Sequence, residues 1–199
     1  MIHVVMPFSR PNNIPALHEH LEGLGVVWHP IIANVPWPEE YGSDWIDPMY
    51  VEIPDGFDPF AHKLNTFAAL WPIVDGDRYC MLCDDDMFGP GYVETLRSVS
   101  GRIVVTSMKR GQHVPNNGRE HPATTLIGSP ANMRTGLIGI QQCPVTGDIF
   151  KQFYFPTDEP NRCDGIVAEW LRDNYLSEII FMPDLFILFN RLQPGRWDA

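Results

Sequence analysis

Short apolar runs alternate with segments of helical periodicity through the first half of the chain. Continuous apolar runs indicate buried strands, whereas apolar residues spaced three or four apart indicate helices packed by one face. Ile14, Leu17 and Leu21 show the helical spacing, and Pro7 is expected to end the first strand. The predicted strands are residues 2–6, 26–32, 79–83 and 102–106, and the predicted helices are residues 14–24, 61–72 and 92–98.

Two stretches interrupt this pattern. Residues 34–60 are rich in Pro, Trp, Tyr and Asp with one short strand near Val51, and residues 108–135 form a polar excursion. The remaining predicted strands are residues 135–140, 179–182 and 185–189, and the remaining helices are residues 147–153 and 165–174. The alternation of strands and helices predicts an α/β fold with a parallel sheet.

Composition indicates a soluble globular protein. The 199 residues suit one domain with its own core, and 44% apolar with 20% charged residues is ordinary for this class. A formal charge of -11 argues against sequence-independent nucleic-acid binding over a broad surface, because polyanions are repelled. No apolar run approaches membrane-spanning length and no basic leader precedes one, so we expect a cytoplasmic protein without a membrane span.

The four cysteines do not indicate a disulfide framework. Cys80 and Cys83 lie inside an apolar strand run, and Cys143 and Cys163 are isolated. We expect buried thiols in a reducing compartment.

Three consecutive aspartates, Asp84, Asp85 and Asp86, directly follow the apolar run 79–83. Adjacent carboxylates repel one another unless a cation is held among them. Ligands of open α/β sheets bind just beyond the carboxyl ends of buried strands, which is where this triplet falls. Oxygen ligands suit Mg²⁺ or Mn²⁺, which usually share phosphate oxygens of a substrate. The triplet therefore predicts a metal and diphosphate site, with a solvated acidic loop as the alternative.

Three segments in order carry a resemblance to a known family. They are the strand end Pro7-Phe8-Ser9-Arg10, the helix start Lys63-Leu64-Asn65, and the apolar strand that runs into Asp84-Asp85-Asp86. Over residues 2–106 the chain resembles the GT-A fold glycosyltransferases, particularly family 2-like members. The resemblance implies a Rossmann-like, mixed but mainly parallel sheet flanked by helices, in a single compact domain spanning residues 1–199. Residues 1–106 would bind the nucleotide sugar and residues 107–199 the acceptor.

The resemblance further implies a metal-dependent hexosyl- or pentosyltransferase that moves a sugar from a nucleoside-diphosphate donor, with a UDP-sugar favoured, to an acceptor hydroxyl. Asp86 and Asp84 would bind Mn²⁺ or Mg²⁺, Asp84 would face the ribose or donor sugar, and Asp85 is left open between these roles. Residues that would border the nucleotide or donor are Pro7, Phe8, Ser9, Arg10, Lys63 and Asn65. Taken alone, Lys63 and Asn65 would read as an exposed helix start.

An inverting transferase also needs a base for the acceptor hydroxyl. Asp164 precedes an amphipathic run, where the family places its base, although Cys163 stands where relatives often have an acid. Asp164 as a helix cap is the equal alternative, and Asp158 and Glu159 are the next candidates.

The sequence departs from the family at a late metal ligand. Many relatives supply a histidine there, whereas the last histidine of this chain is His121. Asn190 would stand in weakly or water would complete the shell, and Arg191 would neutralise phosphate.

Basic residues cluster in the excursion between residues 108 and 135 against a single acid, Glu120. They are Lys109, Arg110, His113, Arg119, His121 and Arg134. A solvated loop is one interpretation; an acceptor-facing patch is the other, and it would admit a phosphorylated glycan, a lipid-linked phosphate or a modified nucleic-acid base as acceptor.

Two other functions compete with glycosyl transfer. A sugar nucleotidyltransferase would share the fold and metal, but residues 7–11 lack the glycines of its phosphate loop. A non-catalytic nucleotide- or carbohydrate-binding protein would retain nucleotide without releasing product. Aromatic residues that would stack on sugar rings in such a protein, or else belong to the core, are Trp37, Tyr41, Trp45 and Tyr50.

Overall fold

The computed structural model describes residues 1–111, 123–158 and 162–193. The strands within these residues are β1 (Ile2–Phe8), β2 (Val27–Ile32), β3 (Met49–Tyr50), β4 (Arg78–Met81), β5 (Met87–Phe88), β6 (Ile103–Arg110), β7 (Thr124–Leu126), β8 (Val145–Thr146) and β9 (Ile179–Phe189). The α-helices are α1 (Ile14–Leu21), α2 (Pro59–Leu70), α3 (Tyr92–Ser98), α4 (Gly147–Phe150) and α5 (Cys163–Tyr175). Short 3₁₀ turns are η1 (Pro11–Asn13), η2 (Glu39–Tyr41), η3 (Pro130–Asn132), η4 (Ile140–Gln142) and η5 (Leu176–Glu178).

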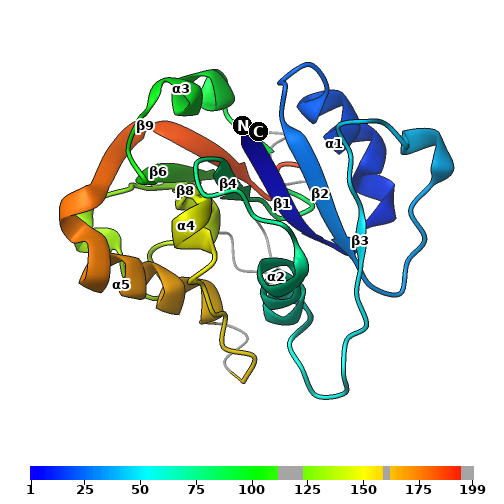
Figure 1. Ribbon diagram of the computed structural model, residues 1–199. Helices are drawn as coiled ribbons and strands as arrows, with labels where there is room; N and C mark the ends of the chain where they lie inside the picture. Colours follow the sequence, from blue (N-terminus) through cyan, green and yellow to red (C-terminus); the bar gives the residue numbers. More distant parts are fainter. Residues whose placement is uncertain (112–122, 159–161, 194–199) are drawn as a thin grey trace.

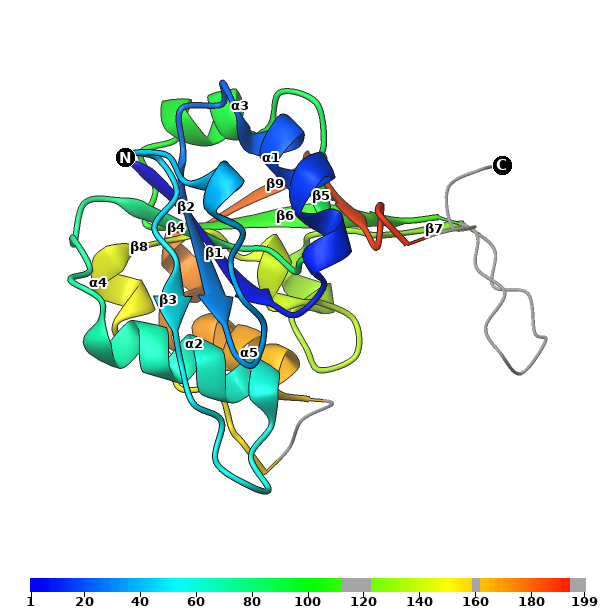
Figure 2. The ribbon, with the colours of Figure 1, turned by 90° about the vertical axis from the view of Figure 1, so that its right-hand side faces the viewer.

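The strands form one mixed sheet in the order β3-β2-β1-β4-β8-β6-β9-β5, with β7 beside β6. The first four of these run parallel, as do β6 and β9. Antiparallel pairing joins β8 to its two neighbours and β5 to β9. Helices α1 and α3 cover one face, and α2, α4 and α5 cover the other (Figures 1 and 2). This confirms the predicted α/β fold with a mixed sheet flanked by helices.

The strand order reverses at β1. The chain leaves β1 through α1 to reach β2 on one side, and returns through α2 to reach β4 on the other side. Because α1 and α2 lie on opposite faces (Figure 2), the carboxyl ends of β1 and β4 lie at a topological switch point of the sheet. Such a switch point is where open α/β sheets bind ligands.

An apolar layer covers each of the two faces of the sheet. Val5 of β1 packs into the layer under α2, α4 and α5, whereas Val4 and Met6 pack into the layer under α1 and α3. All three side chains are 0% exposed. Side chains of a strand alternate between faces, so a strand covered on both sides reads as a continuous apolar run.

The aromatic stretch after β2 is ordered largely by its own rings. Trp37, Tyr41 and Trp45 pack against the cluster around the buried Trp28. Tyr50 is 63% exposed. The first three side chains are therefore partly buried against the core, which favours that one of the two interpretations.

The prediction that Pro7 ends the first strand is wrong. Pro7 pairs in register with Ile31 of β2, and β1 continues to Phe8. The ladder to β4 has already ended at Val5 and Met81, so the proline lies where β1 has one partner strand instead of two.

The predicted strand at residues 135–140 is also wrong, because this segment forms turns and η4. Gly136 has a φ of 84°, a left-handed conformation that glycine adopts readily. Ile138 and Ile140 still pack into the core under α5. Periodicity alone cannot distinguish such a buried turn from a short strand.

The two predicted terminal strands are one strand, β9, with a bulge. Its pairing with β6 passes from Thr106 opposite Met182 to Ser107 opposite Phe186. The extra residues between these pairs include Pro183, which cannot donate to the ladder.

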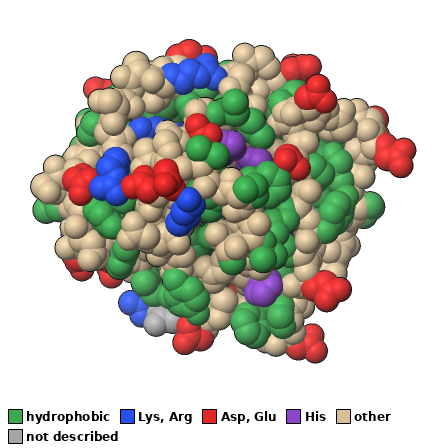
Figure 3. Space-filling model, in the orientation of Figure 1, with side chains coloured by type: hydrophobic (Ala, Val, Ile, Leu, Met, Phe, Trp, Pro, Cys, Tyr) green, Lys and Arg blue, Asp and Glu red, His purple; other side chains and the backbone are tan. Residues whose placement is uncertain are grey.

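The state of the cysteines and the distribution of surface charge are as expected from the sequence. None of the four cysteines, all of which lie in the described residues, forms a disulfide; Cys83 is half-buried and the others are buried. Acidic side chains lie around the rim of the face in Figure 3, and several of its basic groups lie beside acidic ones. Among the described residues, none of the helices has the length and apolar character needed to cross a bilayer.

A buried histidine makes stability depend on pH. His29 on β2 is 1% exposed, with Nε2 2.9 Å from Nδ1 of His3, whose Nε2 lies 3.0 Å from Asp77 Oδ2. Burial, helped by His3, lowers the pKa of His29 from 6.5 to about 4. As the pH falls below 6.5, His29 therefore becomes protonated in the unfolded chain, whereas in the folded protein it stays neutral down to about pH 4. The free energy of unfolding should fall by up to about 3 kcal/mol across this window.

Urea unfolding at pH 7 and pH 4.5 checks this expectation. In His29→Gln the loss of stability between the two pH values should be smaller than in the wild type by about 2 kcal/mol. His62→Gln, on the partly exposed side of α2, serves as the control and should lose as much as the wild type. Equal losses in wild type and His29→Gln would show that His29 does not titrate in this way.

Candidate functional site

A cavity of about 480 Å³ opens at the carboxyl ends of β1 and β4. This volume falls within the range of small-ligand sites, roughly 300 to 1,000 Å³. Strand ends, the first turns of α2 and the end of β9 form its walls. The lining residues are Pro7, Ser9, Arg10, Asp58, Pro59, Phe60, Lys63, Cys83, Asp84, Asp85, Phe189, Asn190 and Gln193. Of the predicted site residues, Pro7, Ser9, Arg10, Lys63, Asp84 and Asp85 thus come together, whereas Phe8, Asn65, Asp86 and Asp164 are outside this lining.

Asp84 anchors the loop that follows β1. Its Oδ2 accepts the main-chain N–H groups of Ser9 at 2.6 Å and Arg10 at 2.8 Å, and the Ser9 hydroxyl at 3.1 Å. The Arg10 guanidinium donates to Oδ1. The Asp84 carbonyl also accepts the Asn13 side-chain amide at 2.8 Å. The carboxylate is 2% exposed and ties the end of β4 to the loop after β1.

Asp85 is held from the opposite side by the C-terminal segment. Gln193 donates its amide to Oδ2 of Asp85, and the N–H of Leu192 donates to the Asp85 carbonyl at 3.0 Å. Arg10 Nη1 lies 3.4 Å from the same Oδ2. Burial raises the pKa of Asp85, although the charge of Arg10 works against this. Sequence analysis missed Gln193, because nothing in its surroundings marks it as a partner of the triplet.

Asp86 points into the protein. It is 0% exposed, and its Oδ1 accepts the N–H of Asn190 at 2.7 Å. Its Oδ2 makes no hydrogen bond within the described residues, and the carboxyl group interacts with Cys83. Burial raises the pKa of Asp86 to about 7, despite the bond from Asn190. The assignment of Asp86 as a metal ligand stays a prediction; in this structure the carboxylates at the cavity are Asp84, Asp85 and Asp58.

Lys63 lines the cavity and contacts the main chain of Phe8. Lys63 is 4% exposed and donates from Nζ to the Phe8 carbonyl at 2.5 Å, so the interpretation of an exposed helix start is wrong for this residue. Burial lowers its pKa, and the charge of Asp84 partly opposes that shift. The Phe8 ring is buried in the core beside Trp37.

Asn65 serves a different contact from the one predicted. Its amide donates to the Phe155 carbonyl and accepts the Phe155 N–H, both at 2.8 Å. It thereby ties α2 to the segment before α5.

Asp58, which sequence analysis did not single out, lines the cavity and caps α2 by accepting the Ala61 N–H at 2.8 Å. The Asp-Pro pair before an apolar helix was the available signal.

Asp164 lies in the first turn of α5 and accepts the Gly165 N–H at 2.7 Å. Burial raises its pKa, while that hydrogen bond and the charge of Arg110 oppose the shift. A Cβ on Gly139 would lie 3.5 Å from Asp164 Oδ2. From η4, next to Gly139, Gln141 donates to Cys83 Sγ at 2.8 Å. Contacts through η4 thus connect Asp164 to the strand end that carries the triplet.

The alternative bases are less well placed. Asp158 is exposed at the protein surface, and Glu159 lies outside the described residues.

The predicted basic patch divides between two faces. Lys109 and Arg110 are neighbours on β6, so their side chains point to opposite sides of the sheet. Lys109 Nζ lies 3.4 Å from the ring centre of Phe186, and Arg110 Cζ lies 4.8 Å from that of Phe189. Arg134 is exposed. The other predicted members, His113, Arg119 and His121, lie outside the described residues together with Glu120.

The contacts of the carboxylates decide where a divalent cation could bind. No group of three or more His, Cys, Asp and Glu side chains arranged for a metal occurs in residues 1–111, 123–158 and 162–193. Both oxygens of Asp84 already accept protein donors. A cation at Asp85 would therefore be completed by phosphate oxygens and water, which is how Mg²⁺ is commonly held.

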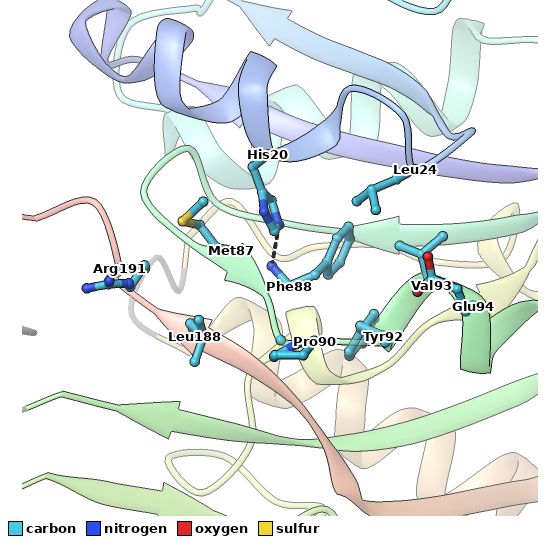
Figure 4. A pocket seen from close by; sticks show the side chains of 12 residues that line it. His20, Leu24, Met87, Phe88, Pro90, Tyr92, Val93, Glu94, Leu188 and Arg191 are labelled. Atoms are coloured by element: carbon cyan, nitrogen blue, oxygen red, sulfur yellow. Dashed lines mark hydrogen bonds between the residues drawn. The ribbon is translucent and has the colours of Figure 1, made fainter.

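A second cavity, of about 540 Å³, lies between α1, α3 and the end of β9 (Figure 4). Its walls are mostly apolar, with Phe88 and Leu188 among them, and Arg191 lies at one end. His20 Nε2 accepts the Phe88 N–H at 2.9 Å, and burial lowers the pKa of His20, which keeps the ring neutral. The first cavity gathers more groups suited to a diphosphate, so we assign the candidate site there. Arg191 lines the second cavity, away from its predicted role beside the first.

The fold of this chain is similar to that of solved structures. The crystal structure of S. aureus TarS 1–349 matches with a TM-score of 0.55 and 13% identity, over 93% of this chain and 59% of that chain. The crystal structure of S. aureus TarS matches with a TM-score of 0.55 and 12% identity, over 93% of this chain and 36% of that chain. The chain thus spans less than two thirds of the length of either structure. No sequence profile of a known family and no curated protein matches it. The likeness confirms an α/β domain with a curled mixed sheet, similar to the GT-A fold.

Proposed function

We propose that this protein is a glycosyltransferase that moves a sugar from a nucleoside-diphosphate donor, with UDP as the carrier, to an acceptor hydroxyl. The observation that carries the proposal is the cavity at the switch point, where Arg10 and Lys63 meet Asp84 and Asp85. The fold shared with TarS, a glycosyltransferase, supports it.

The chemistry requires stabilisation of the leaving diphosphate. Negative charge develops on that group as the glycosidic bond breaks, and fixed positive charge lowers the barrier. Lys63 is positioned for this because it lines the cavity and its ammonium is held by the Phe8 carbonyl. The Ser9–Arg10 loop, anchored on Asp84, would border the nucleoside.

The charges at the cavity favour a divalent cation with the donor. Asp58, Asp84 and Asp85 carry three negative charges against two positive charges on Arg10 and Lys63. A diphosphate adds further negative charge. Mn²⁺ or Mg²⁺, held by Asp85 and the phosphate oxygens, would supply Lewis-acid stabilisation of the leaving group.

Asp164 is the proposed base for the acceptor hydroxyl. A general base works best when its pKa lies near the operating pH, and burial raises the pKa of Asp164 in that direction. Its oxygen beside Gly139 faces residues of the acceptor half.

A thermal-shift panel of nucleoside diphosphates and their sugars, with and without Mn²⁺, tests the proposal. A ligand that binds the folded state alone raises its stability, by about 2.7 kcal/mol at a hundredfold excess over Kd. We expect the largest shift with a uridine nucleotide and Mn²⁺ together, and a lost shift in Lys63→Met. Absence of a shift with every nucleotide would contradict the proposed donor site.

A further inference from the structure

One nitrogen of Arg10 bridges two carboxylates at the cavity. Nη1 donates to Asp84 Oδ1 and lies 3.4 Å from Asp85 Oδ2. The carboxylate side chains are 2% and 3% exposed, whereas the Arg10 side chain is 47% exposed. The guanidinium therefore reaches the buried pair from the solvent side, at the position expected for a bound cation.

The guanidinium can leave this position without undoing the loop. Three donors from Ser9 and Arg10 other than the guanidinium bind Asp84 Oδ2, and these remain when the Arg10 side chain moves. Lys63 differs, because its ammonium is buried and fixed on the Phe8 carbonyl. Arg10 is thus the cation of this cavity that has both a solvent-exposed side chain and a loop that stays anchored.

Neither a divalent cation nor a diphosphate suits the cavity by itself. A divalent cation that enters by itself meets the charge of Arg10 beside Asp85. A diphosphate that enters by itself meets three carboxylates, those of Asp58, Asp84 and Asp85. When both enter, the cation can take the place beside Asp85 and the guanidinium can pair with phosphate, which arginine binds through two parallel hydrogen bonds.

We propose that Arg10 is the resident counter-ion of Asp84 and Asp85 in the free protein, and that a divalent cation and a nucleoside diphosphate bind as a coupled pair that moves the guanidinium onto the diphosphate. The inference rests on the proposed function, because it takes a diphosphate as the ligand of this cavity.

Mn²⁺ binding followed by electron paramagnetic resonance, with and without UDP, tests the coupling independently of turnover. We expect UDP to raise the Mn²⁺ affinity of the wild type by about tenfold or more. Without UDP, Arg10→Met should bind Mn²⁺ about tenfold more tightly than the wild type, because a like charge a few ångströms away has been removed. UDP should then raise its Mn²⁺ affinity by a smaller factor.

Arg97→Met is the matched control, since it removes one exposed guanidinium that hydrogen-bonds to the Leu24 and Gly25 carbonyls beyond α1. It should leave both Mn²⁺ affinities unchanged. Unchanged or weaker Mn²⁺ binding by Arg10→Met without UDP overturns the proposal. If Arg10→Met does not fold, the wild type decides, because equal Mn²⁺ affinity with and without bound UDP also overturns it. A wild type that binds no UDP under any condition refutes the proposed function instead.

Discussion

Asp164→Asn is expected to lower kcat by about 10² to 10⁴, the range that general-base catalysis supplies. Asparagine keeps an oxygen for the Gly165 N–H but cannot take up a proton, so the variant separates a base from a residue that only stabilises the first turn of α5. Release of UDP from the UDP-sugar that gives the largest thermal shift provides the readout. Binding of UDP and Mn²⁺ should be unchanged, because Asp164 does not line the donor cavity.

Two further variants, Asp164→Ala and Asp158→Asn, distinguish the alternative roles of these residues. If Asp164 only stabilises α5, Asp164→Asn keeps full turnover and Asp164→Ala loses about 1 kcal/mol of stability. Asp158→Asn tests the exposed alternative and should turn over normally. Loss of turnover in Asp158→Asn, with Asp164→Asn active, would transfer the proposed base to Asp158.

Asp84→Ala should lower the free energy of unfolding by about 1 to 3 kcal/mol, the cost of leaving part-buried donors without their acceptor. The substitution leaves the Ser9 and Arg10 N–H groups without their acceptor and Arg10 without its nearest carboxylate. Because this loop forms one cavity wall, UDP binding should be lost as well. Urea unfolding and the thermal shift with UDP measure the two effects.

Asp55→Ala is the control for this experiment, since Asp55 is an exposed acid in the loop before α2. Surface substitutions of this kind change stability by less than about 0.5 kcal/mol. Asp84→Asn should be milder than Asp84→Ala, because its amide oxygen still accepts one main-chain donor. A loss below about 1 kcal/mol in Asp84→Ala would show that the loop is held by other contacts.

Local patterns predicted the strands and helices of the first half, but not the short antiparallel strands β5, β7 and β8 that make the sheet mixed. Doubly buried strands such as β1 and β4 are continuous apolar runs, and helices such as α1 show one apolar face. The errors concern three places: residues 135–140 fill the core as a turn, Pro7 lies within β1, and the two expected terminal strands form one strand with a bulge that includes Pro183. Packing, which is not local, decides those cases.

The candidate site was predicted in position but not in its pairings. The place of Asp84 to Asp86 after a buried strand located the cavity, because the carboxyl end of a middle strand is set by topology. Which carboxylate faces the cavity depends on partners far along the chain. Asp84 binds the Ser9–Arg10 loop 74 to 75 residues earlier, and Asp86 binds Asn190 104 residues later. Sequence spacing carries no signal for such contacts.

A crystal structure of the protein with UDP and Mn²⁺ tests the central claim most directly. We expect density for the diphosphate in the cavity at the carboxyl ends of β1 and β4, between Lys63 and Asp85, with the Ser9–Arg10 loop beside the nucleoside. Nucleotide density in the apolar cavity between α1 and α3, with the first cavity empty, would contradict it.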